Sequence, residues 1–352
     1  MIPIDPLLTA VERLRWAGCR AAGIGRLGPD ERYFEPGEGR PGDPRYLAEL
    51  DELNERFEEY LEPAGVGAPP PGRVRREGEF VTFPSARPCG DPRVDRVVVR
   101  LYPAPPDAGE GGVLFHHWVY AGRWSAIDYL LAPLASRFRV AVMVAPHHMM
   151  RRRPGFRPGE GMLNQNPRRL FEALRQWQAD HAATRALLRR DFGFERLVVV
   201  GYSLGAYGLL LARLFGLRDP AVAVCVTNNY QRGVREGAAT AHLARRILAA
   251  GFTWESFRRA TRALHLARHA GRIGGDGLTF VRARYDRIEP SDSLDELIRA
   301  LGPERLVFLP GGHSTAALFR HRIAREVAAR MAAAYGTPRT PAPDPVRVRA
   351  EA

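Results

Sequence analysis

The sequence predicts an α/β protein whose central sheet is mostly parallel, has eight strands and carries helices on both faces. Eight short runs of β-branched or other apolar residues follow one another along the chain. From the third run onward, most are separated by segments with helical periodicity. Such alternation of buried strands with helices is typical of a parallel sheet that is covered on both sides.

The predicted strands lie within residues 73 to 335, after the Pro/Gly-rich stretch GVGAPPPGR. In chain order they are EFVTF, RVVVRLY, GVLFHH, RVAVMVA, RLVVVGY, AVAVCVT, LTFVRARYD and RLVFLPGGH. Helical periodicity is clearest at 167–193, 204–216 and 316–336, and each of these segments ends at a glycine, which favours helix termination. We expect residues 73–335 to form the main domain.

The two ends of the chain differ from this domain. Residues 1–72 are predicted to form a helical extension, because apolar residues recur at helical spacing in segments 5–22 and 43–61. The first segment is rich in arginine and the second in acidic residues, so we expect an antiparallel pair packed on the main domain. An alternative is that the basic first helix lies on a membrane surface. Residues 336–352 are predicted to be a disordered tail.

The net charge of +13 does not by itself indicate a nucleic-acid partner. All 52 basic residues are arginine, and alanine, glycine and proline are abundant, which is the composition that a GC-rich coding sequence produces. No basic segment interleaves aromatic residues in a nucleic-acid-binding motif, so we expect no nucleic acid partner.

Three further features favour a soluble cytoplasmic protein. No apolar run is long enough to span a bilayer, and the N-terminus lacks the pattern of a secretory signal. The three cysteines, Cys19, Cys89 and Cys225, lie far apart, which indicates reduced thiols rather than disulfides or a zinc site. The sequence gives no indication of an oligomeric state.

The stretch VVVGYSLGAYGLLLARLF places Ser203 between Gly201 and Gly205, where a predicted strand meets a predicted helix. In so tight a turn, a β-carbon at either glycine would collide with the neighbouring backbone. We therefore expect the serine to stand clear of the sheet in a strained conformation, at the positive end of the following helix. A serine hydroxyl is a weak nucleophile, so it needs a base and a third group that orients the base.

The best candidates for the base and the orienting acid are His313 and Asp286. His313 follows the last predicted strand within a few residues, which places it at the same sheet edge as the serine. Asp286 ends the preceding strand, whereas Asp276 lies at the opposite end of that strand. Asp292 and Asp295 are assigned to the beginning of the next helix.

Over roughly residues 73–335, the chain resembles the α/β-hydrolase superfamily, because Ser203, Asp286 and His313 follow the family's order of serine, acid and histidine. The resemblance implies hydrolysis of an ester or related acyl bond through an acyl-serine intermediate, with a small-molecule acyl substrate and no cofactor. Thioester and amide cleavage use the same machinery and stay open. A binding or scaffold protein that keeps the fold without turnover is the other alternative.

The resemblance also implies an oxyanion hole, formed by the backbone N–H groups of Leu204 and, by position, Trp118. His116 matches the histidine of the family's His-Gly pair, whereas His117 stands where glycine is usual. We expect both histidines, together with Tyr202, to contact substrate.

Residues 228–273 are predicted to be an inserted lid made of two helices, 235–251 and 253–271, with Thr253 as an N-cap. One hypothesis is that its apolar side faces the serine, so that Trp254 and Phe257 shape an acyl pocket. The alternative is simple packing against the core.

Two other motifs leave alternatives open. The pairs His116-His117 and His147-His148 follow neighbouring strands, but no Asp, Glu or Cys joins them at ligand spacing, so hydrogen-bonded pocket histidines are favoured over a metal site. We expect no bound metal. The run Arg151–Arg153 lies at the predicted rim, where it forms either a solvated loop or an anion-binding site.

Overall fold

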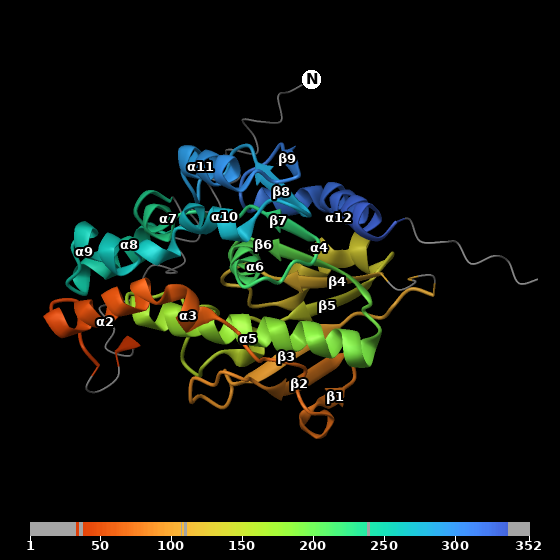
Figure 1. The fold of residues 1–352 in the computed structure, drawn as a ribbon, viewed down its shortest axis with the longest axis horizontal. Coiled ribbons are helices and arrows are strands. Elements are labelled where there is room, and N and C mark those ends of the chain that lie inside the picture. Colours follow the sequence, from red (N-terminus) through yellow and green to blue (C-terminus); the bar gives the residue numbers. More distant parts are fainter. Residues whose placement is uncertain (1–32, 35–37, 107, 109–110, 238–239, 337–352) are drawn as a thin grey trace, which may run out of the picture.

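The computed structural model describes residues 33–34, 38–106, 108, 111–237 and 240–336 (Figure 1). Its nine-stranded sheet has the order β1-β2-β3-β5-β4-β6-β7-β8-β9. Eight strands correspond to the predicted runs, so the predicted count is one too low. The additional strand, β1 (Arg75–Glu77), is exposed and polar, so no apolar pattern in the sequence predicts it. The predicted first helix (5–22), Cys19 and all but the first residue of the tail (336–352) lie outside the described residues.

The sheet is parallel across its centre and antiparallel at one side. Strands β5, β4, β6, β7, β8 and β9 pair in parallel, whereas β3 is antiparallel to both β2 and β5. Every residue of β7 is buried, which explains why its sequence is an uninterrupted apolar run. The eight expected strands are β2 (Phe80–Pro84), β3 (Arg96–Leu101), β4 (Gly111–His116), β5 (Arg139–Met143), β6 (Arg196–Tyr202), β7 (Ala221–Val224), β8 (Leu278–Ala283) and β9 (Arg305–Leu309).

Helices cover both faces of this sheet, as predicted (Figure 1). On one face, α4 (Trp124–Ala135) and α12 (Arg320–Tyr335) share an apolar cluster with the strands. On the other, a larger cluster includes α5 (Pro167–Phe192), α6 (Leu204–Leu214), α10 (Ala270–Ile273) and α11 (Ser291–Leu301). The long helix α5 ends at Gly193, whose φ of 66° is the left-handed conformation that terminates helices.

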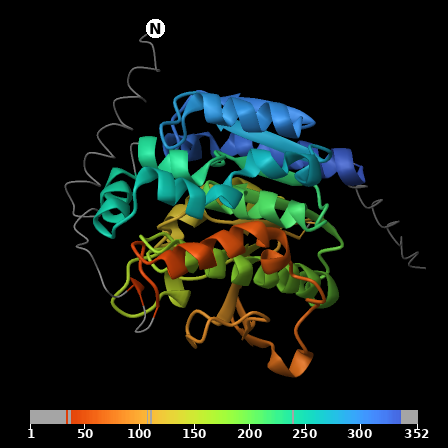
Figure 2. The same cartoon turned by 60° about the vertical axis from the view of Figure 1, so that its left-hand side comes forward.

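The N-terminal helices α2 (Pro44–Glu55) and α3 (Phe57–Leu61) lie within the predicted segment 43–61. Helix α2 packs beside the inserted segment (Figure 2), and a third apolar cluster joins them, including Tyr46, Leu50 and Phe257. Asn54 fastens this contact, because its side chain donates to the Ala260 carbonyl and accepts from the Ala263 N–H, both at 2.8 Å.

The inserted segment is more broken than predicted. Thr253 caps α9 in a reciprocal capping box with Ser256, as expected. The helix nevertheless ends at Ala260 rather than near Gly271, since short 3-10 turns follow it. Its elements are α7 (Tyr230–Glu236), α8 (Ala241–Ala249), α9 (Trp254–Ala260), η4 (Arg262–Leu264), η5 (Leu266–His269) and α10.

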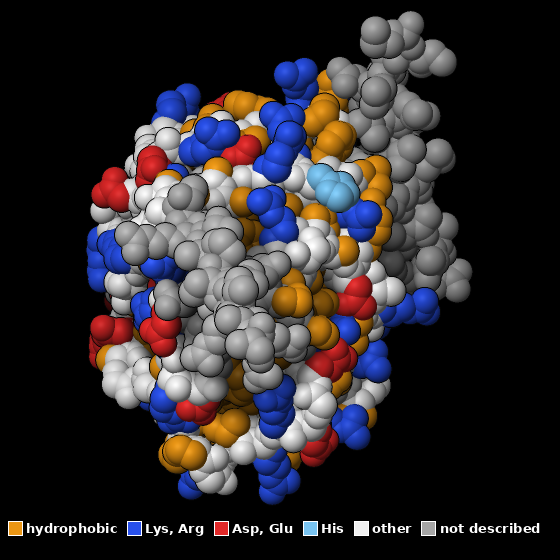
Figure 3. Space-filling view, turned by 90° about the vertical axis from the view of Figure 1, so that its right-hand side faces the viewer, with side chains coloured by type: hydrophobic (Ala, Val, Ile, Leu, Met, Phe, Trp, Pro, Cys, Tyr) orange, Lys and Arg blue, Asp and Glu red, His pale blue; other side chains and the backbone are white. Residues whose placement is uncertain are grey.

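Among the described residues, no helix is both long and apolar enough to cross a membrane. Figure 3 shows one face of the molecule, on which basic side chains lie interspersed with acidic and hydrophobic ones.

Candidate functional site

Ser203 occupies a sharp turn between β6 and α6. Its backbone is strained, with φ 57° and ψ −118° in a residue other than glycine. Steric constraints require glycine at both positions that flank the turn, Gly201 and Gly205. A β-carbon on Gly201 would lie 2.4 Å from the Gly205 carbonyl oxygen, and one on Gly205 would lie 2.0 Å from the His116 carbonyl oxygen. The turn therefore holds the serine at the positive end of α6.

The structure brings Ser203, His313 and Asp286 together from three separate turns. Ser203 Oγ lies 2.7 Å from His313 Nε2, and His313 Nδ1 lies 2.8 Å from Asp286 Oδ2. The side chains of His313 and Asp286 are 10% and 3% exposed, so these hydrogen bonds have little competition from water. The carboxylate accepts from Nδ1, which leaves Nε2 to accept the proton of the serine hydroxyl.

Two further contacts fix the partners of the serine. The Ile288 N–H donates to Asp286 Oδ1 at 2.9 Å, which orients the carboxylate. The Tyr202 hydroxyl donates to the His313 carbonyl, and the Tyr202 side chain is almost fully buried. Tyr202 therefore lies behind His313 and positions the loop that carries this histidine. This positioning role replaces the substrate contact that the sequence predicted for Tyr202.

His117 points away from the site, into the protein. Its Nδ1 donates to the Trp118 carbonyl at 2.9 Å, and its Nε2 accepts from the Ala145 N–H at 3.1 Å. Burial lowers the pKa of His117 to about 4, so the ring is neutral at neutral pH. Both ring nitrogens are used internally, so the predicted substrate contact of His117 is wrong. The side chain instead fixes the peptide of Trp118.

His116 is also directed into the interior. The Trp177 N–H donates to His116 Nδ1 at 3.4 Å, so His116 Nε2 carries the proton and donates to His181 Nδ1 at 2.7 Å. Burial lowers the pKa values of both histidines, which keeps this pair neutral. The predicted substrate contact of His116 is therefore wrong as well. His181 lies on α5, and no sequence motif identified it.

The predicted oxyanion donors lie on either side of the serine turn. Leu204 is the first residue of α6, where backbone N–H groups have no partner within the helix. The loop that carries Trp118 packs against the same turn. The atoms that would lie nearest to a β-carbon on Gly205 belong to the His116 and His117 carbonyl groups. The Trp118 and Tyr202 rings are 5.7 Å apart, which packs the loop beside the serine.

The histidine pairs do not assemble a metal site within the described residues. The group with ligand atoms close enough to share an ion is Cys225, Asp286 and His313, where two members already bond to one another. His148 instead uses Nδ1 on the Pro146 carbonyl at 2.8 Å, and its ring lies 5.0 Å from that of His117.

The run Arg151–Arg153 is not a wholly solvated loop, because two of its three arginines are paired with carboxylates. Arg151 is fully buried and paired with Asp180 at 2.6 Å, and it also donates to the Val94 and Val144 carbonyls. Arg153 pairs with Asp91 at 3.0 Å.

The structure does not place Trp254 and Phe257 with the serine. Phe257 is fully buried, and its ring contacts are with Tyr230, Phe252 and Trp254 in the cluster formed with α2. The packing alternative therefore accounts for the contacts of these two side chains in the described residues, and none of these contacts supports the predicted acyl pocket.

Sequence reasoning missed Glu289, a buried carboxyl three residues beyond Asp286. Its Oε1 accepts from the Asn229 N–H at 3.1 Å and from the Ser293 hydroxyl at 2.5 Å, whereas Oε2 is buried and has no partner in the part of the chain that the structure describes. Burial raises the pKa of Glu289 to about 8.

No protein-family model matches the sequence, and a search of curated proteins found no match. The structure is similar to acetyl xylan esterase 1 from Thermoanaerobacterium sp. JW/SL YS485, with TM-score 0.53 and 15% identity over 81% of this chain and 98% of the other. It is also similar to an acetyl xylan esterase from Paenibacillus sp. R4, with TM-score 0.52 and 13% identity over 85% and 98%.

A third similar structure is the acylaminoacyl peptidase of Pyrococcus horikoshii, with TM-score 0.52 and 14% identity over 74% of this chain. The match spans 41% of that peptidase. The chain therefore has the α/β-hydrolase fold, which the resemblance in its sequence implied.

Proposed function

We propose that the protein is a serine hydrolase that cleaves an ester or a related acyl bond through a covalent acyl-Ser203 intermediate. The observation that carries the proposal is the continuous hydrogen-bonded series from Ser203 Oγ through His313 to Asp286, with separations of 2.7 and 2.8 Å. The strained backbone of Ser203 supports it, since strain of this kind is maintained where a nucleophile must be exposed.

In the first half of the proposed reaction, Ser203 Oγ forms a bond to the acyl carbon while His313 Nε2 takes the hydroxyl proton. The resulting oxyanion accepts hydrogen bonds from the N–H groups of Leu204 and Trp118. When this intermediate collapses, the bond to the leaving group breaks and His313 returns the proton to that group. A water molecule then hydrolyses the acyl-serine by the same steps, while Asp286 holds the imidazole in one tautomer. This chemistry requires no cofactor.

A fluorophosphonate probe, which reacts with activated serines, tests the proposal. We expect the wild-type protein to be labelled, Ser203→Ala to be unlabelled, and His313→Gln to be labelled at least about 100-fold more slowly. Ser136→Ala is the matched control, because Ser136 is exposed at the end of α4 and should be labelled like the wild type. Labelling of Ser203→Ala would place the nucleophile elsewhere, and no labelling of the wild type would favour a binding protein with this fold.

The substrate class is tested next with matched oxygen esters, thioesters and amides of increasing acyl length. Acetyl esters are the first to test, because two of the similar structures are named acetyl xylan esterases. We expect hydrolysis of oxygen esters at rates that exceed those for the matched amides. Faster turnover of thioesters or amides would correct the substrate class without changing the nucleophile.

A further inference from the structure

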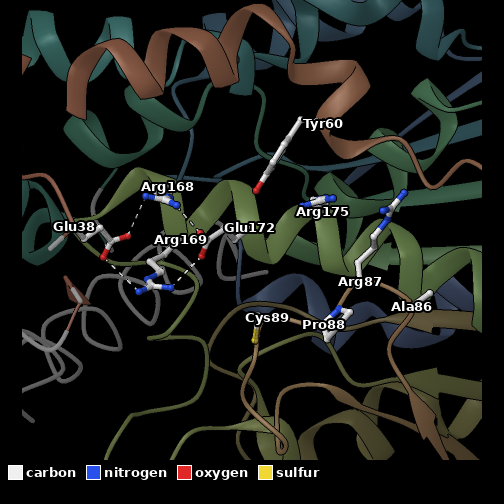
Figure 4. A pocket seen from close by; sticks show the side chains of 10 residues that line it. All are labelled: Glu38, Tyr60, Ala86, Arg87, Pro88, Cys89, Arg168, Arg169, Glu172 and Arg175. Carbon is white, nitrogen blue, oxygen red and sulfur yellow. Dashed lines mark hydrogen bonds and ion pairs between the residues drawn. The ribbon is translucent and has the colours of Figure 1, made fainter. Parts of the chain in front are cut away.

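A charged pocket lies between α5, α3 and the loop after β2, apart from the serine site (Figure 4). Its volume is about 830 Å³, which is large enough for a small organic molecule. None of its lining residues belongs to the candidate active site. They are Glu38, Tyr60, Ala86, Arg87, Pro88, Cys89, Arg168, Arg169, Glu172 and Arg175.

Two of the four arginines in this pocket are already compensated by carboxylates. Arg168 pairs with Glu172 at 3.2 Å and with Glu49 at 3.3 Å. Arg169 pairs with Glu172 at 3.1 Å and with Glu38 at 3.3 Å. The two carboxylates that line the pocket are therefore both held by these arginines, as the dashed lines in Figure 4 show.

The other two arginines, Arg87 and Arg175, form no ion pair with any residue in the described ranges. Arg175 stacks on Tyr60, with its guanidinium carbon 4.8 Å from the ring centroid. A guanidinium has five N–H donors, so its contacts with Tyr60 leave donors for a further ligand. Arg87 Nε is buried and has no acceptor among the described residues. The pocket therefore has two uncompensated positive charges.

The loop that carries Arg87 is held in place before any ligand arrives. The Arg87 N–H donates to Ser85 Oγ, and that hydroxyl donates to Asp180 at 2.5 Å. Further along, the Cys89 N–H donates to Asp95 Oδ1 at 2.7 Å, and Gln176 from α5 donates to the same oxygen. A site that is already ordered loses less entropy when it binds a ligand.

The inner end of the pocket meets a smaller cavity that shares Cys89, Arg169 and Glu172. This cavity has a volume of about 10 Å³, which is about the space of one water molecule. His147 lines this cavity and is 6% exposed, and its Nδ1 has no hydrogen-bond partner among the described residues. The protein thus offers an unused polar group at this end as well.

We propose that this pocket binds a small organic molecule through a phosphate monoester group, whose oxygens accept hydrogen bonds from Arg87 and Arg175. A phosphate monoester has a charge of about −1.5 to −2 at pH 7 and three strong acceptor oxygens on one atom, which suits a pocket lined by two arginines that no carboxylate of the described residues pairs with. A dicarboxylate has the same charge, but it is divided between two separate groups. The volume of the pocket exceeds that of a phosphate ion, so the remainder of the molecule fits beside Tyr60.

Calorimetric titration with phenyl phosphate tests the proposal, with inorganic phosphate, succinate and phenol as comparison ligands. We expect phenyl phosphate to bind at one site per chain and more tightly than the other three. Arg87→Gln and Arg175→Gln should each weaken its binding by about ten-fold or more. The control is Arg137→Gln, which removes the same charge from an exposed arginine after α4 and should bind like the wild type.

Arg175→Lys provides a second variant, which keeps the charge but removes the planar fork, and it should also bind more weakly. Absence of saturable binding in the wild type would overturn the proposal, as would an equal loss in Arg137→Gln. Equal affinity for succinate or inorganic phosphate would overturn the assignment to a phosphate monoester. Both pocket variants should still react with the fluorophosphonate probe, so failure here is distinguishable from failure of the proposed hydrolase function.

Discussion

The hydroxyl of Tyr202 donates a hydrogen bond to the backbone carbonyl of His313. Tyr202 immediately precedes the serine, so this bond joins the turn that carries the nucleophile to the loop that carries the base. The two rings also meet edge to face, with centroids 6.2 Å apart. The separation between serine and histidine therefore depends on a residue that is buried and touches neither reacting atom.

Tyr202→Phe removes this bond and keeps the ring. We expect the rate of fluorophosphonate labelling to fall by about ten-fold, because a small displacement of the base weakens proton transfer. Tyr207→Phe is the matched control, since that hydroxyl donates to the Leu264 carbonyl at 2.9 Å, away from the histidine loop. Each variant should lose about 1–2 kcal/mol of unfolding free energy, but only Tyr202→Phe should lose labelling rate. Equal labelling rates in the two variants would argue against a positioning role.

Gly205→Ala tests the space at the serine turn. The added β-carbon would lie 2.0 Å from the His116 carbonyl oxygen, a backbone atom that cannot move alone. We expect the variant to lose at least about 3 kcal/mol of unfolding free energy or to accumulate as insoluble protein. Gly271→Ala provides the control, because nothing lies within 4 Å of the added carbon and the residue is in the helical segment α10. Urea denaturation of both variants makes the comparison, and a Gly205→Ala protein as stable as the control would contradict the geometry.

Glu289 makes stability depend on pH. Its pKa rises from the ordinary value of 4.5 to about 8 in the folded protein, chiefly through burial, with the nearby Asp286 charge adding and Arg232 opposing. The folded state therefore retains a proton that the unfolded chain has lost. The stabilisation is complete below the unfolded pKa and decreases as pH rises through the folded value.

Between about pH 5 and pH 8, which lies between the unfolded and folded pKa values, we expect the unfolding free energy of the wild type to fall more steeply than that of Glu289→Gln, which cannot titrate. Thermal or urea denaturation at several pH values measures the two slopes. Parallel curves would show that Glu289 does not hold a proton in the folded state.

Asn54→Ala tests how firmly the N-terminal helix is attached. The substitution leaves the Ala263 N–H and the Ala260 carbonyl without their side-chain partner, and Asn54 is 7% exposed. We expect a loss of about 2–4 kcal/mol in unfolding free energy, measured by urea denaturation. Arg56→Ala is the control, because its ion pairs with Glu52 and Glu59 are exposed and should contribute no measurable stability. Equal effects would contradict the attachment.

Much of the sheet follows from local sequence pattern. Each of the eight apolar runs forms a strand. The signal is strongest for central strands such as β7, which is buried on both faces and is therefore apolar along its length. Local pattern also locates Ser203, since Gly201 is required by backbone contacts within a few residues, whereas Gly205 is required by the His116 carbonyl at the end of β4. Strand β1 lacks this signal, because its residues are exposed and only pairing with β2 orders them.

The directions in which side chains point at the site could not be predicted without the tertiary structure. His116 and His117 are adjacent in the sequence, but one bonds to His181 on α5 and the other to the N–H of Ala145. Neither partner lies near them along the chain. Similarly, the sequence leaves open whether the apolar face that contains Phe257 covers the serine or packs elsewhere, because it does not show that α2 covers this face.

The attachment of α2 through Asn54 has a mechanical consequence for residues 228–273. Helix α2 and this insertion share one apolar cluster, and Asn54 forms hydrogen bonds with the 260–263 backbone. Neither segment can therefore move away from the sheet unless the other moves with it or these contacts break. Any opening motion on this side of the molecule would therefore involve two segments separated by more than a hundred residues, moving as a single body.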